Sequence, residues 1–418
     1  MGNERGVALL TTLFFIIVLS VLGTAFVVRS ITESRIALKH ELSTRAFWLA
    51  DAGMQRGTWE LRSNNCIGFV QCGTATACAS CSSCGAGDKC LAASLTHGDY
   101  DVTLNSANTL LTSIGSYPTR SAANRATRTV QVAVAGSSLF SYAAYAQNTV
   151  SLSNNAVIDS FNSTLGTYAA TKGSSGHVGT NAGTAGAIAL DNNATIKGDA
   201  STGASGTVTT GNNASVTGTQ THANNVTLTA ISAPSALSAV TINPDSSAAS
   251  ATKSVGNNDS ATLTAGNWKY AAMSLSNNAT LTIDGDVSLY LTSSTALTTA
   301  NNVVINVSAG SSLTVYSDGV ISLGNNSSVN NVSKVASKFM IYSSYTGTTG
   351  ISLSNNGGIY GAIHAPLTGV SMNNNVDIYG AVVGKSIVLD NNANVHYDQA
   401  LQSIQGSGGY STSNWQEQ

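Results

Sequence analysis

The N-terminal sixty residues combine a fully apolar run with a mixed apolar and charged pattern. Residues 7–28 read VALLTTLFFIIVLSVLGTAFVV and carry no charge. As a helix this run is about 33 Å long, which is enough to cross a bilayer. Residues 29–62 contain no Pro, and their apolar residues recur three, four or seven positions apart. The pattern predicts one continuous helix over residues 7–62, with an apolar stripe in its second half formed by Ile31, Leu38, Leu42, Leu49 and Ala52.

A short leader precedes this helix. Only MGNERG stands before the apolar run, and it ends at Gly6. A secretory signal peptide has a shorter apolar core and a small-x-small cleavage site. Residues 23–25, Gly-Thr-Ala, are the nearest match to such a site, but the apolar run continues beyond them. The run is therefore interpreted as a membrane helix that the mature protein keeps.

From about residue 140 to 400 the pattern becomes a repeat, apolar-x-Asn-Asn-small-x-apolar. Several neighbouring Asn-Asn pairs lie 17 to 24 residues apart, and the 38 residues between Asn154 and Asn192 are interpreted as two coils. A repeat near 20 residues made of short alternating strands predicts a parallel β-solenoid, because one coil buries its apolar side only against the next. Asn tolerates left-handed corners, and stacked Asn side chains form hydrogen-bond ladders.

Two further predictions concern the repeat. The Leu and Ile beside each Asn-Asn pair should point into the interior. Residues 359–362, Ile-Tyr-Gly-Ala, recur at 378–381 and indicate two neighbouring coils. Between the helix and the repeat, alternating apolar residues near Val102 and Val132 predict a small β-element within residues 93–138.

All cysteines lie within 25 residues. An even number of Cys in an exported loop is typical of disulfides, and six Cys allow 15 pairings, so the pairing stays open. Residues 78–84 have the C-x2-C-x2-C spacing of an iron–sulfur site, but no Pro follows the last Cys and only Asp88 interleaves. Disulfides are therefore preferred over a metal or redox site for Cys66, Cys72, Cys78, Cys81, Cys84 and Cys90.

Three segments carry a resemblance to a known family. Residues 5–10 (RGVALL), 32–37 (TESRIA) and 46–54 (AFWLADAGM) resemble the N-terminus of PilX-type minor type IV pilins and pseudopilins, over residues 1–62. The resemblance implies that prepilin peptidase cleaves after Gly6, so that Val7 becomes the mature N-terminus. It also implies that the helix packs with other pilins and passes through the inner membrane.

One position departs from the major pilins, which carry Glu at the fifth mature residue, where it neutralises a neighbour's N-terminal amine. Here that position is Thr11. An unpaired amine in an apolar bundle is costly. We therefore expect a tip or another rare position rather than the repeating shaft of a filament.

The repeat region carries a second, weaker resemblance. Residues 159–163 (DSFNS), with Gly166 and Tyr168, and residues 395–398 (VHYD) resemble the C-terminal domain that accompanies PilX-like N-termini. This resemblance covers about residues 140–400 and implies no enzymatic role.

Composition excludes several classes of function. Charged residues make up 9% of the chain and the net charge is −2, so no basic surface predicts nucleic-acid binding. No Glu occurs between Leu61 and Gln416 and no Arg after Arg128. A polysaccharide-cleaving β-helix needs clustered carboxylates, often with Arg or Lys, so an enzyme is not predicted.

The remaining polar motifs favour structural roles. The pair Asp284 and Asp286 is interpreted as a solvated turn in preference to a calcium site. The Asn-x-Ser/Thr sequons are expected by chance in so Asn- and Thr-rich a chain. No metal site or cofactor is predicted, because the histidines of the repeat region lack ligand spacing and are interpreted as structural: His177, His222, His364 and His396.

The sequence thus predicts an α+β chain with a transmembrane helix, a small β-element and a parallel β-solenoid. Its expected parts are a leader (1–6), the pilin helix (7–62), a Cys-rich loop and small β-region (63–138), the solenoid (139–402) and a flexible tail (403–418). The expected function is a minor pilin or pseudopilin, with other pilins, prepilin peptidase, the inner membrane and a tip adhesin or surface carbohydrate as partners. It would move from the inner membrane to a bacterial surface filament. The alternative is an anchored adhesin or envelope scaffold outside any filament.

Overall fold

The chain divides into two compact units. A computed structural model describes residues 4–62, 69–71, 88–105, 109–228, 230–354 and 356–417. The first unit comprises Met1–Gly136 and Ser407–Gln418, and the second comprises Ser137–Gly406. An apolar helix and an antiparallel sheet make up the first unit, and parallel strands make up the second.

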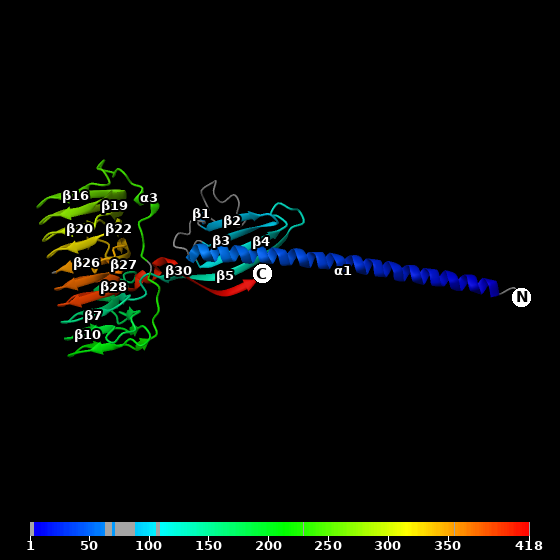
Figure 1. The fold of residues 1–418 in the computed structure, drawn as a ribbon, viewed down its shortest axis with the longest axis horizontal. Helices are drawn as coiled ribbons and strands as arrows, with labels where there is room; N and C mark the ends of the chain where they lie inside the picture. The colour runs from blue at the N-terminus through cyan, green and yellow to red at the C-terminus, as the bar shows by residue number, and fades with distance from the viewer. Residues whose placement is uncertain are drawn as a thin grey trace. The chain divides into compact units, whose positions relative to one another are not determined.

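Helix α1 (Glu4–Arg62) is continuous (Figure 1). Its described side chains are exposed from Leu10 to Glu41, except for the half-buried Val18. By length and composition, α1 is the helix in the described part of the chain that could cross a membrane. The long apolar helix predicted from the sequence is therefore present.

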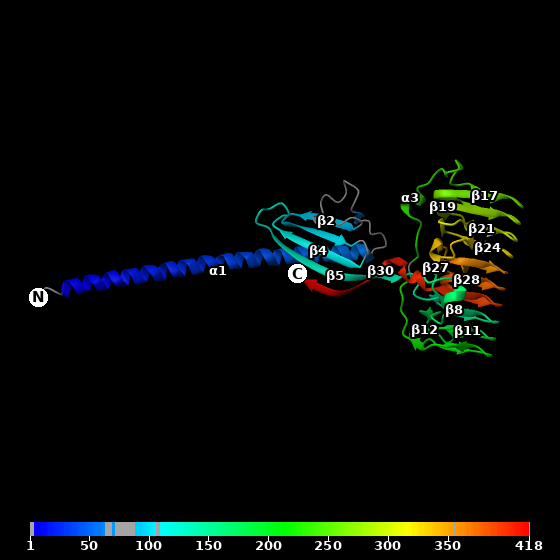
Figure 2. The same ribbon diagram turned by 180° about the vertical axis from the view of Figure 1, so that it is seen from behind.

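The sheet of the first unit lies against the second half of α1 (Figure 2). Its order is β1-β2-β3-β4-β5-β30, and β1 to β5 pair antiparallel in sequence. The strands are β1 (Val70–Gln71), β2 (Lys89–Leu95), β3 (Gly98–Leu104), β4 (Leu110–Tyr117), β5 (Ala126–Ser138) and β30 (Gln405–Glu417).

The C-terminus differs from the expected loose tail over residues 403–418. The structure has β30 there, beside β5 at the edge of the sheet. Without it, β5 would leave a row of backbone N–H and C=O groups without a strand partner. The Gly- and Ser-rich composition suggested a tail. Composition does not reveal this strand, because backbone pairing needs no apolar side chains.

The face of α1 that packs on the sheet is lined by small residues. Ala46, Ala50 and Gly53 are buried there. A Cβ added to Gly53 would lie 2.4 Å from Ser113 Oγ, and one added to Gly115 of β4 would lie 2.1 Å from the Ala46 carbonyl oxygen. Helix and sheet therefore approach so closely that side-chain atoms do not fit between them at these points.

The apolar stripe predicted for this helix is the wrong packing face. Ile31, Leu38 and Ala52 are exposed, and Leu42 and Leu49 are half-buried. The physical reason is the short distance between the backbones, which selects Ala and Gly instead of Leu and Ile at the contact.

The second unit consists of 24 strands with parallel pairing between repeats. The strands form three rows: row A comes before each Asn-Asn pair, row B comes after it, and row C follows row B. Some long strands pass through two or three rows. In chain order the strands are β6 (Ala144–Ala146), β7 (Val150–Leu152), β8 (Val157–Phe161), β9 (Val178–Thr180), β10 (Ile188–Leu190), β11 (Thr195–Ile196), β12 (Ala200–Thr202), β13 (Val208–Thr210), β14 (Ser215–Val216), β15 (Gln220–His222), β16 (Thr252–Val255), β17 (Ser260–Tyr270), β18 (Ala272–Leu275), β19 (Thr280–Leu291), β20 (Thr295–Thr299), β21 (Val304–Val307), β22 (Ser312–Ser317), β23 (Val320–Leu323), β24 (Ser328–Asn331), β25 (Phe339–Ser343), β26 (Thr349–Ser354), β27 (Gly358–Asn373), β28 (Asp377–Asp390) and β29 (Asn394–Asp398). Four short helical turns join them: α2 (Tyr168–Thr171), α3 (Ser235–Ser238), η1 (Ala336–Lys338) and η2 (Gln399–Ser403).

The repeat residues occupy the interior as expected. The predicted match of 359–362 with 378–381 is confirmed, because Ile359 pairs with Ile378 and Tyr360 with Tyr379. The Leu, Ile and Val beside the Asn-Asn pairs are at most 2% exposed, which confirms that they point inward: Leu152, Ile158, Leu190, Ile196, Leu275, Leu281, Leu353, Ile359, Leu389 and Val395.

The repeats are not stacked in chain order. β28 pairs with β6 and β7, and β29 pairs with β8, so the last repeat of the chain contacts the first. In Figure 1 the colour passes directly from red at β28 to green at β7. The spatial order is therefore residues 252–398 followed by 144–222, and residues 223–251 join the two ends of the stack. We call the contact between residues 377–398 and 144–161 the seam.

One spacing was interpreted wrongly. Asn192 Nδ2 donates to Asn154 Oδ1 at 3.0 Å, and β10 pairs directly with β7. The 38 residues between these Asn are therefore one repeat and not two coils. The extra length is an excursion over residues 162–176 that contains α2, and spacing alone does not distinguish an insertion from a second repeat.

Candidate functional site

The predicted processing and disulfide residues have the following places. Gly6, Val7 and Thr11 lie in the first turns of α1. Cleavage after Gly6 and the effect of Thr11 stay predictions. Cys90 is buried in β2, and the disulfides stay a prediction because the other cysteines lie outside the described residues: Cys66, Cys72, Cys78, Cys81 and Cys84.

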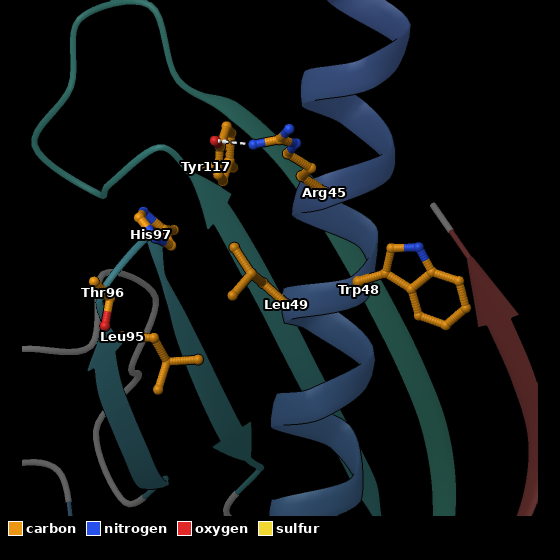
Figure 3. A pocket seen from close by; sticks show the side chains of 7 residues that line it. All are labelled: Arg45, Trp48, Leu49, Leu95, Thr96, His97 and Tyr117. Carbon is orange, nitrogen blue, oxygen red and sulfur yellow. Dashed lines mark hydrogen bonds between the residues drawn. The ribbon is translucent and has the colours of Figure 1, made fainter.

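A groove of about 460 Å³ lies between α1 and the turn from β2 to β3 (Figure 3). Trp48 and Leu95 supply exposed apolar surface, with exposed fractions of 63% and 50%. Arg45 donates a hydrogen bond to the Tyr117 hydroxyl, and its guanidinium carbon lies 5.0 Å from the centre of the Tyr117 ring. Among the described residues, the lining includes Arg45 and His97 and contains no carboxylate.

The Asn-Asn corners form the ladder predicted from the sequence. Asn278, Asn302 and Asn326 have positive φ, of 61°, 58° and 54°. Each donates its side-chain amide to the Asn one repeat away, with distances of 2.8 to 3.1 Å. The same pattern crosses the seam, where Asn155 Nδ2 donates to Asn392 Oδ1 at 3.1 Å. The ladder therefore continues across the seam, although the two repeats there are far apart in the sequence.

A buried polar cluster lies at the seam. His396 Nδ1 is 2.6 Å from Asp159 Oδ1, and the Tyr168 hydroxyl donates to Asp159 Oδ2 at 2.8 Å. Asp159 is completely buried, and Lys172 Nζ lies 3.4 Å from its Oδ2. The cluster thus joins the excursion over residues 162–176 to both sides of the seam.

Asp398 makes a second set of contacts there. Its carboxylate accepts backbone hydrogen bonds from Ser163 at 3.0 Å, Ala400 at 3.1 Å and Ala336 at 3.4 Å. The Tyr397 hydroxyl donates to the carbonyl oxygen of Phe140 at 2.5 Å. Residues 159–163 and 395–398, which carried the second resemblance, are therefore paired strands of the seam.

The charges of the cluster shift its pKa values. Burial raises the pKa of Asp159, but the hydrogen bond and charge of His396 outweigh burial and leave that pKa below its ordinary value. Burial lowers the pKa of His396, and the hydrogen bonds to Asp159 and Asp377 raise it further than burial lowers it. Each partner thus favours the charged form of the other, which suits a structural tie.

Neighbouring aromatic rings complete this surface. Tyr360 and Tyr379 are stacked with ring centres 4.2 Å apart and planes 8° from parallel. The rings of Tyr379 and His396 are 4.7 Å apart. Each of these rings therefore has one face against its neighbour.

The other histidines and acids do not converge. His364 is buried, and its Nδ1 has no hydrogen-bond partner among the described residues. Asp284 and Asp286 are exposed, and Ser312 Oγ donates to Asp286. No group of three or more His, Cys, Asp or Glu side chains that could hold a metal ion occurs in the described part of the chain.

Sequence reasoning did not find the pair of Asp159 and His396. The two residues are 237 positions apart, and no spacing within either segment points to the other. The only available signal was that both lie in segments with the same resemblance.

Comparison with known proteins gives a family match and similarity to solved structures. Residues 220–404 match the model of a domain of unknown function (DUF7305), which is less than half of the chain. No curated protein matches. Among solved structures, the chain is similar to the competence-associated pilin ComZ from Thermus thermophilus, at 10% identity and a TM-score of 0.24, over 90% of this chain and 97% of that one. A similarity of this size carries no functional inference.

Proposed function

We propose that this chain is a minor pilin or pseudopilin. Prepilin peptidase would cleave it after Gly6, and α1 would hold it first in the inner membrane and then in a type IV pilus or secretion pseudopilus. The observation that carries the proposal is the division of α1 into two halves. The first half is apolar and exposed, and the second is packed on a sheet through Ala46, Ala50 and Gly53.

This division suits a filament subunit. The exposed apolar half needs lipid or other helices to cover it, because so large an apolar surface is unfavourable in water. The packed half ties the sheet to the same rigid element. A neighbouring subunit that covers the first half would therefore also fix the position of the sheet.

The parallel unit is proposed to be a β-solenoid that serves for adhesion or for binding a partner at the cell surface. Strands in three rows that pair from repeat to repeat support this reading. Its outward positions are mostly Ser, Thr and Asn, which suit contact with polar surfaces. The enzyme hypothesis receives no support from the seam cluster, since the Asp159 carboxylate is buried and already bonded.

The first test is mass spectrometry of the N-terminus, in membrane and sheared-surface fractions. A chain that begins at Val7 supports processing as a pilin. An intact Met1, or a cut near Ala25, would favour the alternative of an anchored adhesin or scaffold outside any filament.

A second test addresses the rare position in the filament. Thr11→Glu would supply the carboxylate that major pilins use, and we expect more copies per filament by quantitative mass spectrometry. Thr12→Glu is the matched control, because it adds the same charge at the neighbouring position. An unchanged copy number in Thr11→Glu would contradict the proposed role of Thr11.

A third test addresses the solenoid. Deletion of residues 140–400 should preserve membrane insertion and remove attachment of cells to surfaces. Membrane fractionation of the same strain is the control for insertion. Unchanged attachment would show that the solenoid has another role.

A further inference from the structure

One end of the stack is an unpaired edge. The terminal repeat, residues 208–222, contains β13, β14 and β15, and these strands pair only with β10, β11 and β12. Among the described residues no strand pairs with their other side. Three parallel strand edges therefore present backbone N–H and C=O groups at this end.

The apolar interior also reaches this end without a full cover. Val208 pairs with Ile188 and Val216 pairs with Ile196. The two Ile are completely buried, whereas the two Val are only half-buried. The end of the stack thus combines open backbone groups with partly exposed apolar side chains.

The sequence lacks the usual protection of such an edge. Exposed edge strands normally carry charges, Pro or bulges, or are covered by another segment. Between Asp199 and Pro234 there is no Asp, Glu, Lys, Arg or Pro, and His222 is the only residue there that can gain a charge near neutral pH. No bulge interrupts the pairing of β13, β14 or β15. The edge is therefore suited to pairing rather than to exposure.

The opposite end of the stack is partly covered. Asn243 Oδ1 accepts a hydrogen bond from the backbone N–H of Lys269 at 2.7 Å, and Ala271 N donates to the Ala251 carbonyl at 2.9 Å. The segment 243–251 therefore contacts row C at Lys269 and the start of row A at Ala271. Two charged residues also lie at this end: Lys253 in β16, paired with Asp245, and Asp259 directly before β17.

We propose that the terminal repeat binds the terminal repeat of a second copy of this chain. The two edges would meet about a two-fold axis with antiparallel strands. An edge without charges does not repel its own copy, whereas a charged edge would. Head-to-tail stacking would need the opposite end, where segment 243–251 contacts row C and where Lys253 and Asp259 carry charges. A two-fold contact closes at two copies and leaves no further edge.

Site-specific cross-linking of the full chain in its native membrane tests the contact. A photoreactive residue replaces Thr209, which is exposed on β13. We expect links to residues 208–222 of a second copy, identified by mass spectrometry of the linked peptides. Links to residues 252–270, links to a different protein, or no links would each overturn the proposal. A photoreactive residue at Ser294, exposed in the middle of the stack, is the control and should give no such links.

Adding positive charges to the uncharged edge gives an independent test of the contact. Thr209→Lys with Thr219→Lys places two like charges opposite their two-fold mates, and we expect the association to weaken at least tenfold. The readout is the concentration dependence of backbone hydrogen exchange in residues 208–222, which is insensitive to association through α1. Ser294→Lys with Thr346→Lys, both exposed mid-stack positions, is the control and should leave the dependence unchanged. Exchange that does not depend on concentration in the parent chain would overturn the proposal.

Discussion

Where α1 meets the sheet, Gly53 faces Ser113 and Gly115 faces Ala46, whereas in the repeats Leu and Ile fill the interior. The first contact depends on glycines, which have no Cβ. The second depends on large apolar side chains at equivalent positions of the repeats. Both contacts bury apolar surface. At the first, the absence of a side chain on Gly allows the two backbones to approach closely. A buried contact made by Gly and Ala is therefore hard to predict from the sequence, whereas one made by repeated Leu and Ile is easy to predict.

The largest effect is expected for Gly115→Leu. Its Cβ would lie 2.1 Å from the Ala46 carbonyl oxygen and 2.4 Å from the Ala50 nitrogen. Because both contacts are with helix backbone, we expect a loss of more than about 5 kcal/mol in the unfolding free energy of the first unit. Hydrogen exchange of β3 and β4 in the full chain measures it. Gly23→Ala, with no atom within 4 Å of the added Cβ, is the control, and equal exchange in both variants would refute the close-packing account.

The next effect is expected for Asp159→Ala at the seam. Removing the Asp159 carboxylate takes away the closer partner of His396 and leaves Asp377 as its remaining acidic neighbour, at a cost of about 3–5 kcal/mol. We expect hydrogen exchange to increase in residues 144–222 more than in residues 280–330, because only the former depend on the seam. Ser322→Ala, a half-buried position in the middle of the stack, is the control. A uniform increase along the stack would mean that the seam is not a separable contact.

The pH dependence of stability sharpens the same comparison. Burial lowers the pKa of His364 to about 4, below its unfolded value of about 6.5. Its contribution is therefore present above pH 6.5 and is lost, by about 3 kcal/mol, as the pH falls towards 4. His364→Phe should remove this dependence between pH 6.5 and 4, as measured by denaturant titration at each pH.

His396 should behave in the opposite way. Its pKa is raised, so its contribution is present below pH 6.5 and is lost as the pH rises through the folded value. His396→Gln should therefore flatten the alkaline side of the profile and leave the region between pH 4 and 6.5 dependent on His364. The opposite assignment of the two sides would contradict the structural roles of these histidines.

The smallest effect is expected in the Asn ladder. Asn302→Gly keeps the positive φ of 58° available but removes the side-chain bonds to Asn278 and Asn326, for a loss of about 1 kcal/mol. Asn302→Ala removes the same bonds and also strains the backbone, which adds about 1 kcal/mol. Thermal unfolding of the two variants separates the terms, and equal stability of the two would show that the left-handed conformation contributes nothing.

The parts of the fold that were predicted from the sequence are those with a long apolar run or a periodic pattern. The run at residues 7–28 indicated α1, and the Asn-Asn pairs indicated parallel repeats with Leu152 and Ile158 inside. It did not predict the face of α1 that packs on the sheet, because Gly53 and Ala46 carry little hydrophobic signal. It also missed β30, whose pairing with β5 depends on backbone groups.

The seam was beyond the reach of periodicity for a different reason. Every repeat carries a similar Asn-Asn corner, so the ladder alone does not specify which repeats are neighbours. The unique partners Asp159 and His396 supply that choice, as buried ion pairs can. They lie in segments that gave no local sign of each other.

The seam also sets a timetable for the newly made chain. Residues 144–161 have their strand partners on one side in residues 377–398, which are synthesised more than 200 residues later. At about 5–20 residues per second, the first repeat waits roughly 10 to 40 seconds for its neighbour. During that interval its edge is available to other strands. The stack therefore cannot be completed before residues 377–398 have been synthesised.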